Sequence, residues 1–243
     1  MNTAREGSGA RAGAGRSLAA SPLVCIFCRA PVPGRTKTRL AAAIGDERAA
    51  ALSSAMLLDI VTTLTADGLD VRAAAADPID VGTLRALLPG IDVHSQPEGD
   101  LGARMSAVLE QLVSASGRTA AIVGADAVLI RPELVRRAGE AIVGGADAAI
   151  CPASDGGYSL IAAARPVPAL FRAISWGSAH VLDQTLSRAS AAGLRVALLE
   201  DLDDIDVVED LARVTENSAL SRSSVAVRTR HLCSALSVGA RGS

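Results

Sequence analysis

A basic loop follows the first apolar run of the chain and precedes a helical pattern. Pro33 and Gly34 fix an extended turn there, and four cations crowd around it: Arg29, Arg35, Lys37 and Arg39. Lys37 is the only lysine in the chain, since all other basic residues are arginine. Loops that lead into helix N-termini favour phosphates, and an ammonium beside forked guanidiniums suits a diphosphate. The loop therefore predicts a phosphate site, with a solvated basic turn as the alternative.

Lys37 is expected to be exposed in this loop. Its replacement by Ala should then weaken nucleotide binding by about 1–3 kcal/mol, the range for a lost charge-assisted hydrogen bond. The melting temperature without ligand should barely change, because an exposed lysine contributes little to folding.

Two acidic segments could hold a divalent metal ion. An apolar run, residues 120–124, leads to Asp126, where a carboxylate at the end of a strand can hold Mg²⁺ against phosphate oxygens. Further on, alternation would put Asp204 and Asp206 on the same side of an extended segment. A helix cap is the alternative for both segments. Lys37 should lie within about 15 Å of Asp126, because a diphosphate and its metal span less than that.

Two glycine-containing segments complete the candidate site. Asp155, Gly156, Gly157 and Tyr158 follow one another, and paired glycines allow either a ligand or a hairpin turn close to the backbone. Residues 99–105 predict a polar loop that opens a helix. Tyr158 is the only tyrosine and Trp176, further along, the only tryptophan, so each is conspicuous in an aromatic-poor chain. A hairpin with a packed tyrosine remains the alternative.

Short β-like runs alternate with helical patterns, which predicts an α/β fold with a parallel sheet covered on both faces. The expected strands are 23–28, 70–75, 91–95, 120–124, 148–152, 158–162 and 195–199. The expected helices begin at Asp46, with a buried stripe from Leu52 to Leu64, and continue at 81–88, 101–113, 132–142, 179–191 and 207–214.

Composition limits the partners and the domain organisation. At 243 residues and a net charge of −2, the chain has room for one domain and no electrostatic reason to bind nucleic acid. No apolar run reaches the ~18 residues of a membrane span. We expect a disordered leader over 1–21, a domain over 22–215 and a basic tail over 216–243. The tail could be disordered, a short helix or an oligomer contact, and the protein is expected to be cytoplasmic.

Cys25 and Cys28 form a C-x-x-C pattern within the first expected strand. Positions three apart on a strand point to opposite faces, so the two sulfurs cannot easily share a ligand. We therefore expect small buried thiols in a reducing compartment rather than a metal or redox site.

Taken in order, these segments resemble the DUF2064 family, also called the radical-SAM/selenodomain-associated transferase 1 family, of the nucleotide-diphospho-sugar transferase (GT-A) superfamily. The matching segments are 31–40, 96–105, 124–126, 155–158, 176–178 and 204–211. Ala125 stands where the family has a hydroxyl residue, Ala127-Val128 where it has a small residue and proline, and Gly177-Ser178 where it has Ser-Thr.

The resemblance implies a GT-A three-layer α/β sandwich with a mostly parallel mixed sheet. It also implies roles for residues of this chain, which are expectations here. Nucleotide would contact Pro33, Gly34, Lys37, Arg39, Gly99, Asp100, Gly102 and Arg104. The acceptor would contact Gly156, Gly157, Tyr158, Trp176 and Ser178. Metal would bind Asp126 and Asp206, and catalysis would involve Asp126, Lys37 and Asp155.

The implied function is a metal-dependent transferase acting on a nucleotide-activated substrate. A glycosyltransferase with a nucleotide-sugar donor, a small-molecule acceptor and Mg²⁺ or Mn²⁺ is the leading expectation, and the protein could be a homo-oligomer. A nucleotidyltransferase acting on a phosphorylated small molecule is the first alternative. The second alternative is a degenerate nucleotide-binding protein. Ala125 and Ala127-Val128 favour it, because they depart from the family pattern.

Overall fold

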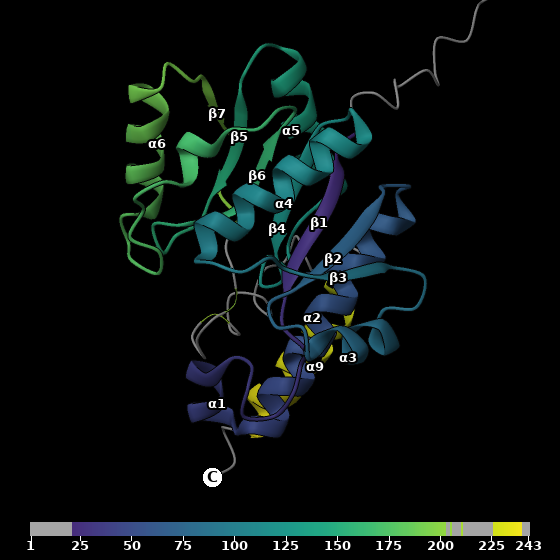
Figure 1. Ribbon diagram of the computed structural model, residues 1–243. Coiled ribbons are helices and arrows are strands. Elements are labelled where there is room, and N and C mark those ends of the chain that lie inside the picture. Colours follow the sequence, from purple (N-terminus) through teal and green to yellow (C-terminus); the bar gives the residue numbers. More distant parts are fainter. Residues whose placement is uncertain (1–20, 203–204, 206–209, 211–225, 240–243) are drawn as a thin grey trace, which may run out of the picture.

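The computed structural model describes residues 21–202, 205, 210 and 226–239 (Figure 1). Seven strands form one sheet in the order β3-β2-β1-β4-β6-β5-β7. Strand β6 runs antiparallel to both of its neighbours, and every other pairing is parallel. The strands are β1 (Leu23–Cys28), β2 (Val71–Ala75), β3 (Asp92–Ser95), β4 (Ala120–Gly124), β5 (Ala148–Pro152), β6 (Tyr158–Ala163) and β7 (Val196–Leu198). All seven predicted strands are confirmed to within one residue at either end.

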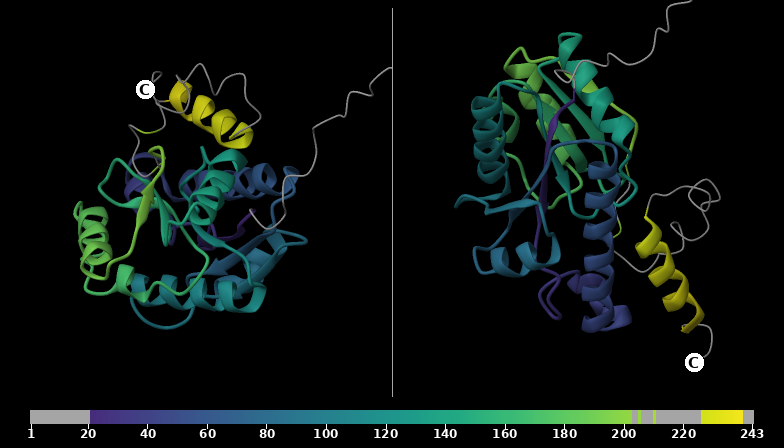
Figure 2. Two further views of the ribbon diagram at one scale, coloured as in Figure 1. Left: turned by 90° about the horizontal axis from the view of Figure 1, so that it is seen from above. Right: turned by 90° about the vertical axis from the view of Figure 1, so that its right-hand side faces the viewer.

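Helices cover both faces of the sheet, which confirms the predicted three-layer α/β sandwich. Helices α2 (Asp46–Ala66) and α5 (Pro132–Val143) pack on one face, and α4 (Leu101–Ser116), the 3₁₀ turn η2 (Pro168–Phe171) and α6 (Val181–Ala191) pack on the other. The right-hand view of Figure 2 shows α4 and α5 on opposite sides of the sheet. The remaining helices are α1 (Thr38–Ile44), α3 (Asp80–Leu87) and α9 (Val227–Gly239). Pro132 begins α5, as its missing N–H favours.

Helix α9 lies in the C-terminal segment. From the sequence, this segment could be a disordered tail, a short helix or an oligomer contact. The helix packs against α2 (Figure 2), beginning at the buried carboxylate of Asp59. That carboxylate accepts hydrogen bonds from the backbone N–H of Arg228 (3.2 Å) and of Thr229 (2.8 Å), the Thr229 hydroxyl (2.9 Å) and the Arg228 guanidinium (3.1 Å). Asp59 thus caps a helix nearly 170 residues away along the chain. The helix predicted over 207–214 lies outside the described residues except for Asp210.

Helix α2 is long and apolar enough to cross a membrane by length and composition, which the sequence analysis did not anticipate. More than half of its most apolar stretch, 56%, is buried inside the structure. Leu57, Ile60 and Leu64 pack against the strands, so α2 is accounted for as a core helix.

The two cysteines of the C-x-x-C pattern are buried on opposite faces of the sheet, as their spacing predicts. Cys25 belongs to the core on the α4 face and Cys28 to the core on the α2 face. Burial raises the pKa of each thiol to about 12.

The carboxyl ends of the parallel strands meet at one edge of the sheet. Because β6 is antiparallel, its first residue, Tyr158, lies at this same edge, close to Gly124 at the end of β4. Ligands of open α/β sheets bind outside the carboxyl ends of the strands. The fold therefore brings the basic loop after β1, Asp126 after β4 and the β5–β6 turn to one edge.

Candidate functional site

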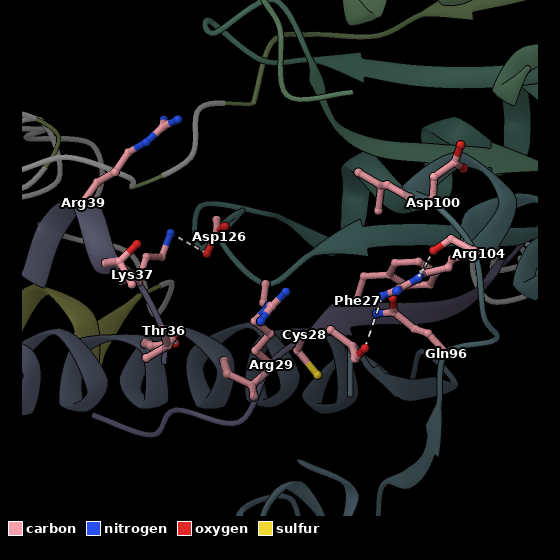
Figure 3. Close-up of a pocket in the computed structure, with 17 residues that line it drawn as sticks. Phe27, Cys28, Arg29, Thr36, Lys37, Arg39, Gln96, Asp100, Arg104 and Asp126 are labelled. Atoms are coloured by element: carbon pink, nitrogen blue, oxygen red, sulfur yellow. Dashed lines mark hydrogen bonds and ion pairs between the residues drawn. The ribbon is translucent and has the colours of Figure 1, made fainter. Parts of the chain in front are cut away.

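A cavity of about 640 Å³ opens at this edge of the sheet (Figure 3). Its walls come from the segments that follow β1, β2, β3 and β4, together with the first turns of α1 and α4. Lys37 and Asp126 lie at one end of this first cavity, and Gln96 and Arg104 lie at the other (Figure 3). Its cationic lining residues are Arg29, Lys37, Arg39 and Arg104.

Lys37 is buried, and the expectation of an exposed loop lysine is wrong. Only 5% of its side chain is accessible, and its ammonium lies 2.5 Å from Asp126 Oδ1 and 2.5 Å from the carbonyl oxygen of Ile205. Its backbone is left-handed (φ 48°, ψ 46°) at the start of α1. That conformation costs a non-glycine residue about 1 kcal/mol or more and is held where surrounding contacts impose it. The distance also satisfies the requirement that Lys37 lie within reach of Asp126.

The basic loop is fastened to α3 by Asp80. This carboxylate is 3% exposed, accepts the backbone N–H of Ala30 at 3.1 Å and lies 3.3 Å from the Arg35 guanidinium, which also lies 3.5 Å from Asp77. Arg35 therefore serves the loop's own structure, which corrects its grouping with the phosphate-facing cations. Asp80, which the sequence analysis overlooked, fixes where the loop begins.

Pro33 and Gly34 shape the turn but line neither of the cavities described here. Gly34 has φ +76°, which a residue with a side chain rarely adopts, and the turn closes with Arg35 N–H donating to the Val32 carbonyl at 3.0 Å. The turn precedes Lys37 and presents it to the first cavity, and the contact of Pro33 and Gly34 with nucleotide stays a prediction.

At the far end of the first cavity, Arg104 holds the loop after β3. Its guanidinium donates to the carbonyls of Gly99 (2.7 Å) and Ala76 (3.2 Å), and Gln96 donates its amide to Ala74 at 2.9 Å. Asp100 caps α4 by accepting the Ala103 N–H at 2.8 Å, as expected for a cap. Gly99, Asp100 and Arg104 all line the cavity.

Gly102 does not line the cavity, and its contact with nucleotide stays a prediction. A side chain built there would lie 2.6 Å from the Phe171 carbonyl and 2.7 Å from the Trp176 ring. Glycine is required because α4 packs directly on Trp176, which in turn meets Tyr158 edge-on with ring centroids 6.4 Å apart.

A second cavity of about 240 Å³ lies on the other side of Asp126, which borders both. Its apolar wall includes Met105, Ala127, Tyr158, Trp176 and Val181, and its polar residues include Asp155 and Ser178. Helix α4 separates the two cavities at Leu101, which lines both.

The turn between β5 and β6 forms one wall of the second cavity. Asp155 Oδ1 accepts the Gly157 N–H at 2.8 Å, and Gly157 lines the cavity. Gly156 does not, because its backbone lies against Ala179: a side chain there would fall 2.1 Å from the Ala179 carbonyl oxygen. Gly156 thus lets the Ala179 segment pack against the turn, and its contact with the acceptor stays a prediction.

The chemistry of Asp126 fits a divalent ion completed by substrate. Its side chain is 42% exposed at the boundary of the two cavities, and Mg²⁺ commonly takes one or two carboxylates together with substrate phosphates and water. Within the described part of the chain, no three His, Cys, Asp or Glu side chains form a metal cluster. The second predicted ligand, Asp206, lies outside the described residues.

Several cavity residues were not singled out as site residues from the sequence. Arg29 was counted only as one cation of the loop, whereas it lines the first cavity. Thr36 and Ser53, whose hydroxyls lie 3.1 Å apart, also line it. Arg29 directly follows β1, and this position at the strand end could have predicted its place in the cavity. Ser53 lies in the middle of α2, and nothing in the sequence around it predicts that it lines the cavity.

Comparison with known proteins places this architecture in a family. A family model described as an uncharacterized protein conserved in bacteria (DUF2064) matches residues 52–178. A solved structure from Desulfovibrio desulfuricans G20 is 30% identical, covers 88% of this chain and 96% of its own, and superposes with a TM-score of 0.78. This chain belongs to the DUF2064 family. The D. desulfuricans protein is described as a candidate nucleotide-diphospho-sugar transferase.

More distant structures share the fold of this DUF2064 protein. CMP:2-keto-3-deoxy-manno-octonic acid synthetase, solved with CTP, is 13% identical with a TM-score of 0.53, covering 83% of this chain and 99% of its own. A cytidylyltransferase from Leptospira borgpetersenii is 12% identical with a TM-score of 0.50, covering 91% and 95%. At these identities the likeness shows the fold alone. No curated protein matches the sequence.

Proposed function

We propose that this protein transfers a sugar from a nucleotide-sugar donor to a small-molecule acceptor, in a reaction that depends on a divalent metal ion. The observation that carries the proposal is the Lys37–Asp126 pair, which lies where a cationic cavity and a largely apolar one meet. The description of the D. desulfuricans relative as a candidate nucleotide-diphospho-sugar transferase supports the same class of substrate.

The first cavity suits the nucleotide part of the donor. Arg29, Lys37 and Arg39 place positive charge on one side of it, where the diphosphate would bind, while the backbone around Gly99 faces the opposite end. A divalent ion at Asp126 would supply further positive charge to the leaving diphosphate.

Asp155 would take the acceptor's proton in this proposal. It lines the second cavity, and its residue is exposed. A carboxylate within hydrogen-bond reach of the attacking hydroxyl or amine acts as a general base. Lys37 and the basic loop stabilise the charge that develops on the departing nucleoside diphosphate.

A nucleotidyltransferase is the second candidate. The first cavity is large enough for a nucleoside triphosphate, and three cationic side chains would contact its phosphates. A degenerate binding protein gains no support at Ala127 and Val128. Both residues are 1% exposed and belong to hydrophobic cores, and Ala127 gives only apolar surface to the wall of the second cavity.

The released product separates these functions. The protein is incubated with Mn²⁺, a panel of nucleotide sugars and nucleoside triphosphates, and mixed acceptors, and the phosphate products are resolved by ³¹P NMR. Release of a free nucleoside diphosphate from a nucleotide sugar is the expected result. Pyrophosphate release from a triphosphate would replace the proposal with the second candidate. Asp126→Asn is the matched control and should release neither.

A further inference from the structure

Gln96 and Arg104 line the end of the first cavity that lies away from Lys37 (Figure 3). Arg104 donates hydrogen bonds to the carbonyls of Gly99 and Ala76. Gln96 donates its amide to a third carbonyl, at the end of β2. Each of these two side chains keeps part of its polar end for a ligand: Gln96 keeps its amide oxygen, and Arg104 keeps its remaining N–H groups.

The carboxamide of Gln96 has one orientation that its surroundings allow. It lies 2.9 Å from the carbonyl oxygen of Ala74, and because a carbonyl only accepts, the group that faces it must be the amide NH₂. The backbone N–H of Gln96 also donates to the Ala75 carbonyl at 2.8 Å, which fixes the residue against the end of β2. Among the residues that the structure describes, none donates a hydrogen bond to Oε1. Gln96 thus offers the cavity an acceptor whose direction is set.

The proposed function places a nucleobase at this acceptor. The cations beside Lys37 would bind the diphosphate, and the ribose and then the base follow it along the cavity, so the base lies nearest to Gln96. Gln96 is half-buried, and at such a position water replaces a missing hydrogen bond less readily than at an exposed one. Asp100, another acceptor that lines the cavity, is exposed, and its Oδ1 already caps α4.

We infer that Gln96 selects the nucleobase of the substrate, by accepting a hydrogen bond at Oε1 from an N–H group of the base. The inference rests on the proposed function for placing a nucleotide in the first cavity. A base that turned an oxygen or an unprotonated ring nitrogen toward Oε1 would leave two acceptors facing each other, and both would lose the hydrogen bond that water gives them.

The common bases differ in the groups that an acceptor can recognise. Cytosine carries an amino group where uracil carries a carbonyl oxygen, and adenine carries an amino group where guanine carries a carbonyl oxygen. The two members of each pair are nearly equal in size, so the volume of the cavity does not separate them. An acceptor held in one direction should therefore separate the members of at least one pair.

Calorimetric titration in the presence of Mn²⁺ compares CDP with UDP and ADP with GDP, and inorganic pyrophosphate serves as the ligand without a base. We expect the wild type to bind one member of at least one pair about tenfold more tightly than the other. Gln96→Met keeps the length of the side chain and removes the amide. It should weaken binding of the preferred nucleotide by about tenfold, and leave the affinities for its partner and for pyrophosphate within about twofold of wild type.

Gln111→Met is the matched control and should change none of these affinities, because Gln111 is exposed on α4 and lines neither cavity. A wild type without preference within either pair overturns the inference. So does an equal loss in Gln96→Met for all four nucleotides, which would assign Gln96 to the ribose, or an equal loss for pyrophosphate, which would make Gln96 a structural residue of its loop. Pyrophosphate release in the product assay would overturn glycosyl transfer alone, because both candidate functions place a nucleotide in the first cavity.

Discussion

Asp59 and Lys37 are both charged, both nearly inaccessible and both paired with residues distant in the chain, yet their surroundings differ. Asp59 is 3% exposed and accepts four hydrogen bonds from the first residues of α9. Lys37 is 5% exposed, but its partner Asp126 is 42% exposed and borders both cavities. The Asp59 carboxylate is enclosed and bonds the buried Thr229, although the side chain of Arg228 is 49% exposed. The Asp126 carboxylate beside Lys37 is instead accessible to a ligand.

This difference separates a structural charge from a functional one. The buried carboxylate stabilises the docking of α9 because the N–H and the hydroxyl of the buried Thr229 would otherwise be left unsatisfied. A buried ammonium in a left-handed backbone, beside an accessible carboxylate, combines strain with an open partner, which is common at functional sites. A substitution at Asp59 should therefore lower mainly the stability of the protein, and a substitution at Lys37 should lower mainly its affinity for nucleotide.

Asp59→Ala should have the largest effect on stability. Removing the carboxylate leaves the hydroxyl and the backbone N–H of the buried Thr229 without a hydrogen-bond acceptor. This loss should lower the free energy of unfolding by about 2–4 kcal/mol. Urea denaturation measures the loss. Thr229→Val, which keeps the side-chain shape and the backbone N–H, should lose about half as much. If Asp59→Ala unfolded at the same midpoint urea concentration as the wild type, this contact would have no structural role.

Lys37→Met should lower nucleotide affinity more than stability. Met replaces a buried ammonium by an apolar chain of similar length, so the free energy of unfolding should stay within about 1 kcal/mol of wild type or rise. Nucleotide affinity should fall by about 1–3 kcal/mol, as predicted for loss of a charge-assisted bond to phosphate. Isothermal titration with a nucleoside diphosphate checks the second value. A stability loss as large as that of Asp59→Ala would make Lys37 structural as well.

The sheet and most helices could be predicted from the sequence because their signals are local. Apolar runs and four-residue periodicity mark β1, β4 and α2 without reference to the rest of the chain. The contacts of the site are not local: Lys37 reaches Ile205, and Asp59 reaches Thr229. Nothing near Lys37 in the sequence indicates that its ammonium is buried.

Glycines illustrate the same limit. A motif at Gly99, Gly102 and Arg104 predicted one nucleotide-facing loop, but Gly102 faces the opposite side of α4 and contacts Trp176. Within the basic loop, charge alone could not separate Arg35, which pairs with Asp77 and Asp80, from Arg29, which lines the first cavity. The position of a residue after a strand predicts that it lies at the ligand-binding edge of the sheet. Which side chains at that edge face the ligand depends on tertiary packing.

Arg104→Lys should have the smallest effect of the series. Lysine keeps the charge but cannot span the Gly99 and Ala76 carbonyls as the guanidinium does. Because Arg104 is only half-buried and lysine keeps its charge, the free energy of unfolding should change by less than about 0.5 kcal/mol. Nucleotide affinity should fall by less than about 1 kcal/mol, through looser positioning of the loop after β3. A loss equal to that of Lys37→Met would mean that Arg104 contacts the nucleotide directly.

Metal-dependent nucleotide binding by Asp126→Asn tests the central claim most directly. Calorimetric titration of a nucleoside diphosphate, with and without Mn²⁺, should show metal-enhanced affinity in the wild type and none in the variant, because one anionic ligand is lost. Without ligand, the variant should lose only a little stability through the pair with Lys37, below about 1 kcal/mol because Asp126 is 42% exposed. Metal enhancement in Asp126→Asn equal to that of the wild type would contradict the account.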